Sequence, residues 1–318
     1  MGLFRKKQDA EHVTHVGVHD ATKPEPIPGG RVERIHGKNG NGKTAPVKET
    51  TEPGAPMSDP LRPIEQTHII VVANQKGGVG KTTTTVNLSA YLAVKGNKVL
   101  IIDLDPQGNA TSGLGIDPSE LESSIYEVLM KRADIDSIIM PTGIEHLYVA
   151  PASFRLVGAQ VELVNVMSRE ARLREIIEPL RGQFHYVIID CPPSLGLLTV
   201  NALTAAEELI IPVQCEYFAL EGLTQLLESI NEVKKYLNPN LRLAGLLMTM
   251  YDARTKLAQQ VVEEVRAHFP GQVYTTVIPR SVRLSEAPSF GQPIVHYDAL
   301  SRGAIAYKEL AEEVMRHG

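Results

Sequence analysis

The sequence has very few cysteines: only Cys191 and Cys215 occur among its 318 residues. Two cysteines are too few for a disulfide scaffold, and their spacing is not the C-x-x-C pattern of a zinc site. Both are therefore expected to be buried packing residues. A reducing compartment, the cytoplasm, is the expected location of the chain.

The chain also lacks long hydrophobic runs. No stretch approaches the roughly 20 apolar residues that a membrane-spanning helix needs. The basic residues of Met1–Lys7 are not followed by the apolar core of a secretory signal. We therefore predict that no segment is integral to a membrane.

An excess of positive charge is absent as well. The 32 lysines and arginines are outnumbered by 37 aspartates and glutamates, which leaves a net charge of -5. Such a molecule has no global basic field that would draw it onto nucleic acid. Any DNA-binding site must therefore be a local cluster of cations on one face.

The first 66 residues differ in composition from the rest of the chain. They are rich in Pro, Gly, Lys and Glu and have no helical or strand periodicity, so they cannot bury enough apolar surface to offset their ordering entropy. We predict a disordered tail over residues 1–66 and one folded domain over residues 67–318. The run Met57–Pro60 also has the form of a translation start, and the sequence leaves both starts open.

From Thr67 onward, short apolar runs alternate with helical patterns, as in repeated β-α-β units. This predicts an α/β fold with a doubly wound, mostly parallel sheet and helices on both faces. Several of the runs are apolar throughout, as strands covered on both faces should be. The predicted strands are His68–Ala73, Lys98–Asp103, Leu147–Ala150, Phe184–Asp190, Glu208–Val213, Arg242–Met250 and Val273–Ile278.

The first predicted strand leads into a glycine-rich loop that opens a helical pattern. Strand, glycine loop and helix are the context of a phosphate-binding P-loop. Lys81 is expected to neutralise β- and γ-phosphate charge, and the Thr82 hydroxyl to coordinate Mg²⁺, which makes ATP and Mg²⁺ the expected cofactors. A glycine turn that only joined strand to helix would not need the Gly-Lys-Thr ending. The predicted nucleotide-binding residues are Gln75, Lys76, Gly77, Gly78, Val79, Gly80, Lys81, Thr82 and Thr83.

The loop departs from the usual G-x-x-x-x-G-K-[ST] pattern. Gln75 stands where the first glycine is expected, and Lys76 adds a second lysine that repels Lys81 unless both face a polyphosphate. With this deviant P-loop the chain resembles the ParA/MinD family of ATPases. The resemblance implies that Lys76 reaches across a nucleotide sandwich dimer to phosphates bound by the other subunit, with Gly77 allowing the two loops to approach.

Two carboxylate motifs follow the P-loop. Asp103 and Asp105 end an apolar strand, where open α/β sheets bind ligands. The resemblance assigns Asp105 to positioning or activating the attacking water. Asp103, one pleat earlier on the same face, is expected to help hold the Mg²⁺ shell or the loop. Asp190 ends the apolar run Tyr186–Asp190, which has the form of a Walker B strand, and is expected beside the metal.

The resemblance extends from about Thr67 to Tyr307 and is greatest to the chromosomal ParA (Soj) branch. It rests further on the runs Asn109–Gly115, Cys191–Thr199, Pro212–Glu216 and Pro279–Pro288. It implies that ATP binding drives sandwich dimerisation, that the dimer binds double-stranded DNA without sequence preference, and that a ParB-like centromere-binding protein stimulates hydrolysis and release. The expected location is then the cytoplasm, in association with the nucleoid.

DNA binding needs cations that project toward phosphates. The resemblance places this role on Arg254 and Arg283, and on Lys256 with less support. It also places the adenine against Pro279 and Arg280. An alternative in which Arg280 pairs with an acid of the fold stays open.

Two other classes of protein share the P-loop scaffold. A MinD-like membrane-cycling ATPase that regulates cell division needs a basic amphipathic helix at its C-terminus, whereas the last segment here carries Glu309, Glu312 and Glu313. No stable membrane association is therefore expected. A nitrogenase-type iron protein needs cluster-bridging cysteines, and neither cysteine of this chain has that context.

Overall fold

The computed structural model describes residues 58–217 and 219–317, and within them seven strands form one sheet in the order β3-β4-β2-β5-β1-β6-β7. Neighbouring strands are parallel except β3, which is antiparallel to β4. This confirms the predicted α/β fold with a doubly wound, mostly parallel sheet. The strands are β1 His68–Val72, β2 Val99–Asp103, β3 Met140–Pro141, β4 Leu147–Ala150, β5 Tyr186–Asp190, β6 Glu208–Gln214 and β7 Arg242–Thr249.

Helices connect the strands, and 3-10 turns occur between them. None of the helices in the described residues is both long enough and apolar enough to cross a membrane. The 3-10 turns are Pro118–Glu120, Ile135–Ser137, Leu163–Asn165, Arg169–Ala171, Glu178–Leu180 and Ala287–Phe290. The helices are α1 Lys81–Val94, α2 Asn109–Ser112, α3 Ile125–Leu129, α4 Leu156–Glu162, α5 Arg172–Ile177, α6 Leu197–Ala205, α7 Ala219–Tyr236, α8 Lys256–His268, α9 Val282–Glu286, α10 Ile294–Tyr297 and α11 Arg302–His317.

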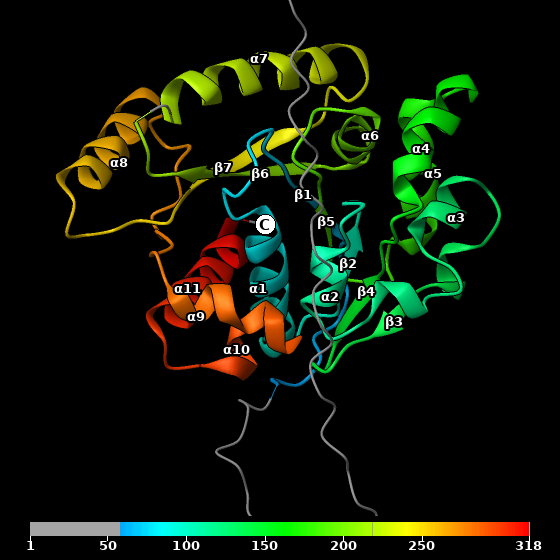
Figure 1. Cartoon of the computed structure of the whole chain (residues 1–318), viewed down its shortest axis with the longest axis horizontal. Coiled ribbons are helices and arrows are strands. Elements are labelled where there is room, and N and C mark those ends of the chain that lie inside the picture. Colours follow the sequence, from blue (N-terminus) through cyan, green and yellow to red (C-terminus); the bar gives the residue numbers. More distant parts are fainter. Residues whose placement is uncertain (1–57, 218, 318) are drawn as a thin grey trace, which may run out of the picture. The chain divides into compact units, whose positions relative to one another are not determined.

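The sheet separates two hydrophobic cores. Along β1, Ile69 and Val71 point into the core that α3–α8 cover, while Ile70 and Val72 point into the core under α1, α2 and α9–α11. Figure 1 shows α7 and α8 on one side of β6 and β7, with α1 and α9–α11 on the other. Burial on both faces explains why these strands are continuous apolar runs. Cys191 and Cys215 are both free and buried, as predicted.

The seventh predicted strand, Val273–Ile278, is not a strand. Its ends follow the edge of β7 through bonds such as Ile278 N–H to the Met248 carbonyl, 2.9 Å. Between them, the N–H groups of Thr275 and Thr276 donate instead to the buried carboxylate of Glu313 on α11, at 2.6 and 3.0 Å. The segment therefore fastens α11 to the sheet edge and does not extend the ladder. The short antiparallel strand β3 was not predicted.

Most of the predicted tail, residues 1–66, lies outside the described residues. Residues 58–66 form no helix or strand, yet they contact the end of α1: the Asp59 N–H donates to the Val94 carbonyl at 2.7 Å and the Arg62 N–H to the Gly96 carbonyl at 2.9 Å. His185 accepts the Lys98 N–H at Nδ1, so its Nε2 donates to the Pro63 carbonyl at 3.1 Å. The boundary of the tail at residue 66 stays a prediction.

Candidate functional site

The glycine-rich loop joins β1 to α1 at the carboxyl edge of the sheet. Gly78 and Gly80 have φ values of 74° and 92°, in the left-handed region that glycine adopts without strain. Thr249 at the end of β7 donates its hydroxyl to the Val79 carbonyl at 2.8 Å. The loop is therefore held against the sheet at the N-terminus of α1, and helix N-termini are sites that bind anions.

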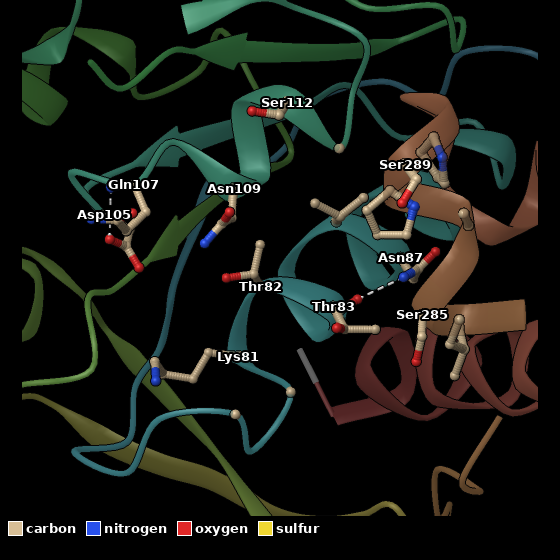
Figure 2. Close-up of a pocket in the computed structure, with 18 of the residues that line it drawn as sticks. Lys81, Thr82, Thr83, Asn87, Asp105, Gln107, Asn109, Ser112, Ser285 and Ser289 are labelled. Atoms are coloured by element: carbon tan, nitrogen blue, oxygen red, sulfur yellow. Dashed lines mark hydrogen bonds between the residues drawn. The ribbon is translucent and has the colours of Figure 1, made fainter. Parts of the chain in front are cut away.

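A cavity of about 570 Å³ lies in front of this loop (Figure 2). Its volume is in the range of small-molecule sites, about 300–1,000 Å³. The loop and α1 form one wall, the segment after β2 forms a second, and the segment from α9 to α10 forms a third. The lining residues include Gly77, Gly78, Gly80, Lys81, Thr82, Thr83, Asn87, Asp105, Gln107, Asn109, Pro193, Met250, Leu284, Ser285, Ala287, Pro288, Ser289, Gln292 and Pro293.

Lys81 is the buried cation of the cavity. Its Nζ donates to the Lys76 carbonyl at 3.0 Å, and Figure 2 shows it on the same side of the cavity as Asp105. Burial lowers the pKa of Lys81, while the neighbouring charge of Asp190 opposes that shift. A buried ammonium without a full set of acceptors gains most from an anionic ligand. The geometry fits Lys81 as a phosphate-binding residue.

Asp190 and Thr82 form the second polar group of the site. The fully buried Asp190 carboxylate accepts the hydroxyls of Thr82 at 2.8 Å and of Thr85 at 3.0 Å. Burial and the nearby Asp103 raise the pKa of Asp190 to about 8. A divalent cation at Thr82 would favour the charged carboxylate, and hydroxyl and carboxylate oxygens are the ligands that Mg²⁺ prefers. The residues present therefore fit the predicted metal.

Asp103 is bound within its own loop. Its carboxylate accepts the Asp105 N–H at 3.0 Å, the Thr111 N–H at 2.9 Å and the Thr111 hydroxyl at 2.7 Å. Burial raises its pKa to about 6, although the bonds from Thr111 act in the opposite direction. It does not line the cavity, so its contacts support the loop-holding role and its place in a metal shell stays a prediction. Asp105 does line the cavity, and its Oδ1 accepts the Gln107 N–H at 3.0 Å.

The third wall was not predicted from the sequence. Pro279 and Arg280 do not line the cavity, so their contact with an adenine stays a prediction, and residues 284–293 form that wall. Bonds from Arg254 lower the pKa of Asp252, and the charge of Arg280 adds a smaller effect, which indicates that Arg280 lies near an acid. The sequence motif Pro279–Pro288 indicated this region. Which of its residues face the cavity depends on how the chain turns at α9, and the sequence does not specify that turn.

Lys76 does not point into its own cavity. Its Nζ forms an ion pair with Glu216 Oε2 at 2.7 Å, and Glu216 also accepts a bond from Gln214. Both members of the ion pair are about half exposed, with side-chain exposures of 53% and 45%. An exposed ion pair contributes only about 0–1 kcal/mol of stability. Lys76 can therefore exchange Glu216 for another anion with little loss of free energy.

The two segments with the predicted DNA-binding residues are joined close to those residues. Tyr251 and Pro279 form a parallel bridge, three residues before Arg254 and four before Arg283, and Lys256 begins α8. Neither arginine is free of acids: Arg254 forms two bonds to Asp252, and Arg283 lies 3.1 Å from Glu286 and 3.4 Å from Asp298. The bonds from Arg254 lower the pKa of Asp252 to about 2.

Comparison with known sequences places this site in a family. A family model described as an AAA domain matches residues 67–243. The sequence is 57% identical over 250 residues to the sporulation initiation inhibitor protein Soj of Bacillus subtilis, which covers 79% of this chain and 99% of that protein. It is 54% identical over 248 residues to the chromosome partitioning protein ParA of Myxococcus xanthus, 78% of this chain and 88% of that protein.

One solved structure is similar to this chain in both fold and sequence. It is titled cobyrinic acid a,c-diamide synthase from Mycobacterium smegmatis with bound ADP and magnesium, and it matches with a TM-score of 0.71 and 41% identity over 79% of this chain and 95% of that chain. That title names a different reaction, but the Soj and ParA proteins share more of this sequence. The chain belongs to the ParA/Soj family of chromosome-partitioning ATPases.

Proposed function

We propose that this ATPase binds ATP with Mg²⁺, closes into a sandwich dimer, binds double-stranded DNA without sequence preference, and releases it when a ParB-like partner stimulates hydrolysis. The observation that supports the proposal is the group of Lys81, Thr82 and Asp190 at the loop, beside Lys76, whose ammonium is paired with Glu216. Lys81 and Thr82 line the cavity and the Thr82 hydroxyl donates to Asp190, while Lys76 is not among the lining residues and its ammonium is paired with Glu216. Such a cycle would act in the cytoplasm, on the nucleoid.

Each step of ATP binding is assigned to residues of this chain. The N–H groups of the loop and the Lys81 ammonium hold the β- and γ-phosphates. Thr82 would hold Mg²⁺ directly and Asp190 through water, and the cation would neutralise charge that develops on the phosphates. Asp105 lines the cavity from the segment after β2 and orients the attacking water.

Lys76 supplies the link between ATP and the dimer. In the monomer its ammonium is paired with Glu216. When a second copy brings a bound triphosphate to this edge, the phosphates offer more negative charge than one exposed carboxylate, and Lys76 exchanges partners. ATP, with its γ-phosphate, therefore favours the dimer more than ADP does.

The membrane-cycling alternative has less support. It requires a C-terminal helix whose apolar face enters lipid. In α11 that face is formed by Tyr307, Leu310, Ala311 and Val314, which are all buried in the core. Exposing these side chains would bring a large part of the core under α1, α2 and α9–α11 into contact with solvent or lipid. The apolar face of α11 is therefore better suited to packing within the chain.

Lys76→Ala should bind ATP as a monomer but fail to dimerise or to hydrolyse it, because the phosphate contact that it loses is made only in the dimer. Size-exclusion light scattering with a non-hydrolysable ATP analogue and Mg²⁺ measures this. Glu216→Gln is the matched control, since it releases Lys76 and should dimerise at least as well as the parental protein. A stable nucleotide-dependent dimer of Lys76→Ala would refute the assignment.

Asp105→Ala should retain ATP and accumulate as an ATP-bound dimer, because the residue acts on water and not on the phosphates. Lys81→Ala, in contrast, should lose nucleotide affinity. Equilibrium binding of a fluorescent ATP analogue and steady-state phosphate release separate the two effects. Hydrolysis by Asp105→Ala at the parental rate would mean that another group positions the water.

Arg283→Glu should abolish DNA binding while leaving ATP-dependent dimerisation and basal hydrolysis near the parental level. Arg283→Ala should weaken binding equally on all duplex sequences and flatten the log–log salt dependence by up to about 2, since a dimer loses two phosphate contacts. Arg283→Lys, which keeps the positive charge at the same position, is the control and should bind DNA with nearly parental affinity. Unchanged binding by both Arg254→Ala and Arg283→Ala would contradict the proposed DNA face.

A further inference from the structure

The third wall of the nucleotide cavity, residues 284–293, faces the cavity with uncharged side chains. Its lining residues are two serines, two prolines, Leu284, Ala287 and Gln292. The charged side chains of the cavity lining, Lys81 and Asp105, stand on the other two walls. Because the loop and Lys81 hold the phosphates, the uncharged wall suits the part of the nucleotide that carries no charge, the ribose and the base.

The side chain of Asn87 joins this wall to α1. Asn87 lies in the second turn of α1, lines the cavity and is only 5% exposed. Its Nδ2 donates to the Thr83 carbonyl at 2.7 Å (Figure 2), and its Oδ1 accepts the N–H of Ile294 at 2.7 Å. Ile294 is the first residue of α10 and directly follows the third wall. Within residues 58–217 and 219–317, no other hydrogen bond connects α1 to residues 284–297.

The two bonds of Asn87 fix one end of the third wall relative to the phosphate loop. One bond ends at Thr83, in the first turn of α1 beside Thr82, and the other ends where the wall meets α10. The opposite end of the wall is held separately, because Leu284 packs closely against Gly303 on α11. Without the Asn87 amide, the buried N–H of Ile294 would lose its acceptor, which is costly away from water. The end near Ile294 would then be held less firmly.

We propose that Asn87 is a positioning residue for the nucleoside part of the nucleotide. It acts through the third wall, which it holds in place relative to the phosphate loop before any ligand enters. A surface that is already ordered loses less conformational entropy when a ligand binds, and this preorganisation raises affinity. The inference rests on the nucleotide binding of the proposed function, but not on its dimer or its DNA face.

The test compares Mg²⁺-ADP with Mg²⁺-pyrophosphate, which has the two phosphates but no nucleoside. ADP is the suitable nucleotide because the proposed dimer depends on the γ-phosphate. Isothermal titration calorimetry of the whole chain gives both dissociation constants. Asn87→Ala should raise the dissociation constant of ADP by about tenfold, because the wall must then be ordered on binding. The dissociation constant of pyrophosphate should not change, since the loop, Lys81 and Thr82 are left intact.

Three further variants separate this role from a general loss of stability. Asn87→Leu keeps the volume of the side chain but removes both bonds, and should behave as Asn87→Ala does. Asn87→Asp keeps an acceptor for the Ile294 N–H, and its charge repels both ligands, so the ratio of the two dissociation constants should stay near the parental ratio. Tyr307→Phe is the matched control: it removes the 3.1 Å hydrogen bond that joins α11 to Thr84 of α1, and should leave both constants unchanged.

The contrary results are equally specific. The inference is wrong if Asn87→Ala and Asn87→Leu weaken pyrophosphate as much as ADP, since the residue would then support the loop or the fold as a whole. It is also wrong if these variants change neither constant, or if Asn87→Asp or Tyr307→Phe alters the ratio as much as they do. All of these results leave the proposed function standing. A parental protein that binds neither ADP nor ATP would overturn the proposed function together with this inference.

Discussion

Two buried carboxylates at the carboxyl ends of adjacent strands determine how the groups of the nucleotide site are arranged. Asp103 on β2 and Asp190 on β5 are register partners and are fully buried. Buried charge is costly unless it is paired and hydrogen-bonded, so the surrounding groups compensate. Thr111 satisfies Asp103 and thereby fixes the loop that carries Asp105, whereas Thr82 and Thr85 satisfy Asp190. The first turn of α1 and the loop after β2 are both arranged around this pair.

Much of the fold and of the site could be predicted from the sequence because it depends on residues that are close together in the chain. The P-loop, the apolar strands that end in Asp103 and Asp190, and the parallel sheet follow from spacing and composition, with strand ends displaced by one or two residues. The segment Val273–Ile278 has strand composition, but a distant carboxylate, Glu313, takes its central N–H groups. The α9–α10 wall of the cavity depends on chain packing in the same way. Long-range contacts of this kind leave no periodic signal in the sequence.

Several ion pairs on the surface are of a kind that another molecule could displace. Lys76 is held by the half-exposed Glu216 at the edge that carries the cavity, and the arginines of the proposed DNA face are paired with partly exposed acids. Exposed ion pairs are weak, so phosphates can replace the acids in both places. ATP would then favour closure through Lys76, and closure would place two copies of Arg254 and Arg283 on one rigid surface. The proposed function would thereby couple the affinity for DNA to the bound nucleotide.

The measurement that tests this coupling most directly is the binding of the unaltered protein to a non-specific DNA duplex at low salt, titrated in parallel with Mg²⁺-ATP, with Mg²⁺-ADP and without nucleotide. The account predicts tight binding with ATP, at a protein concentration where the dimer forms, and much weaker binding in the other two conditions. Equal binding in all three conditions, or no binding with ATP, would contradict it.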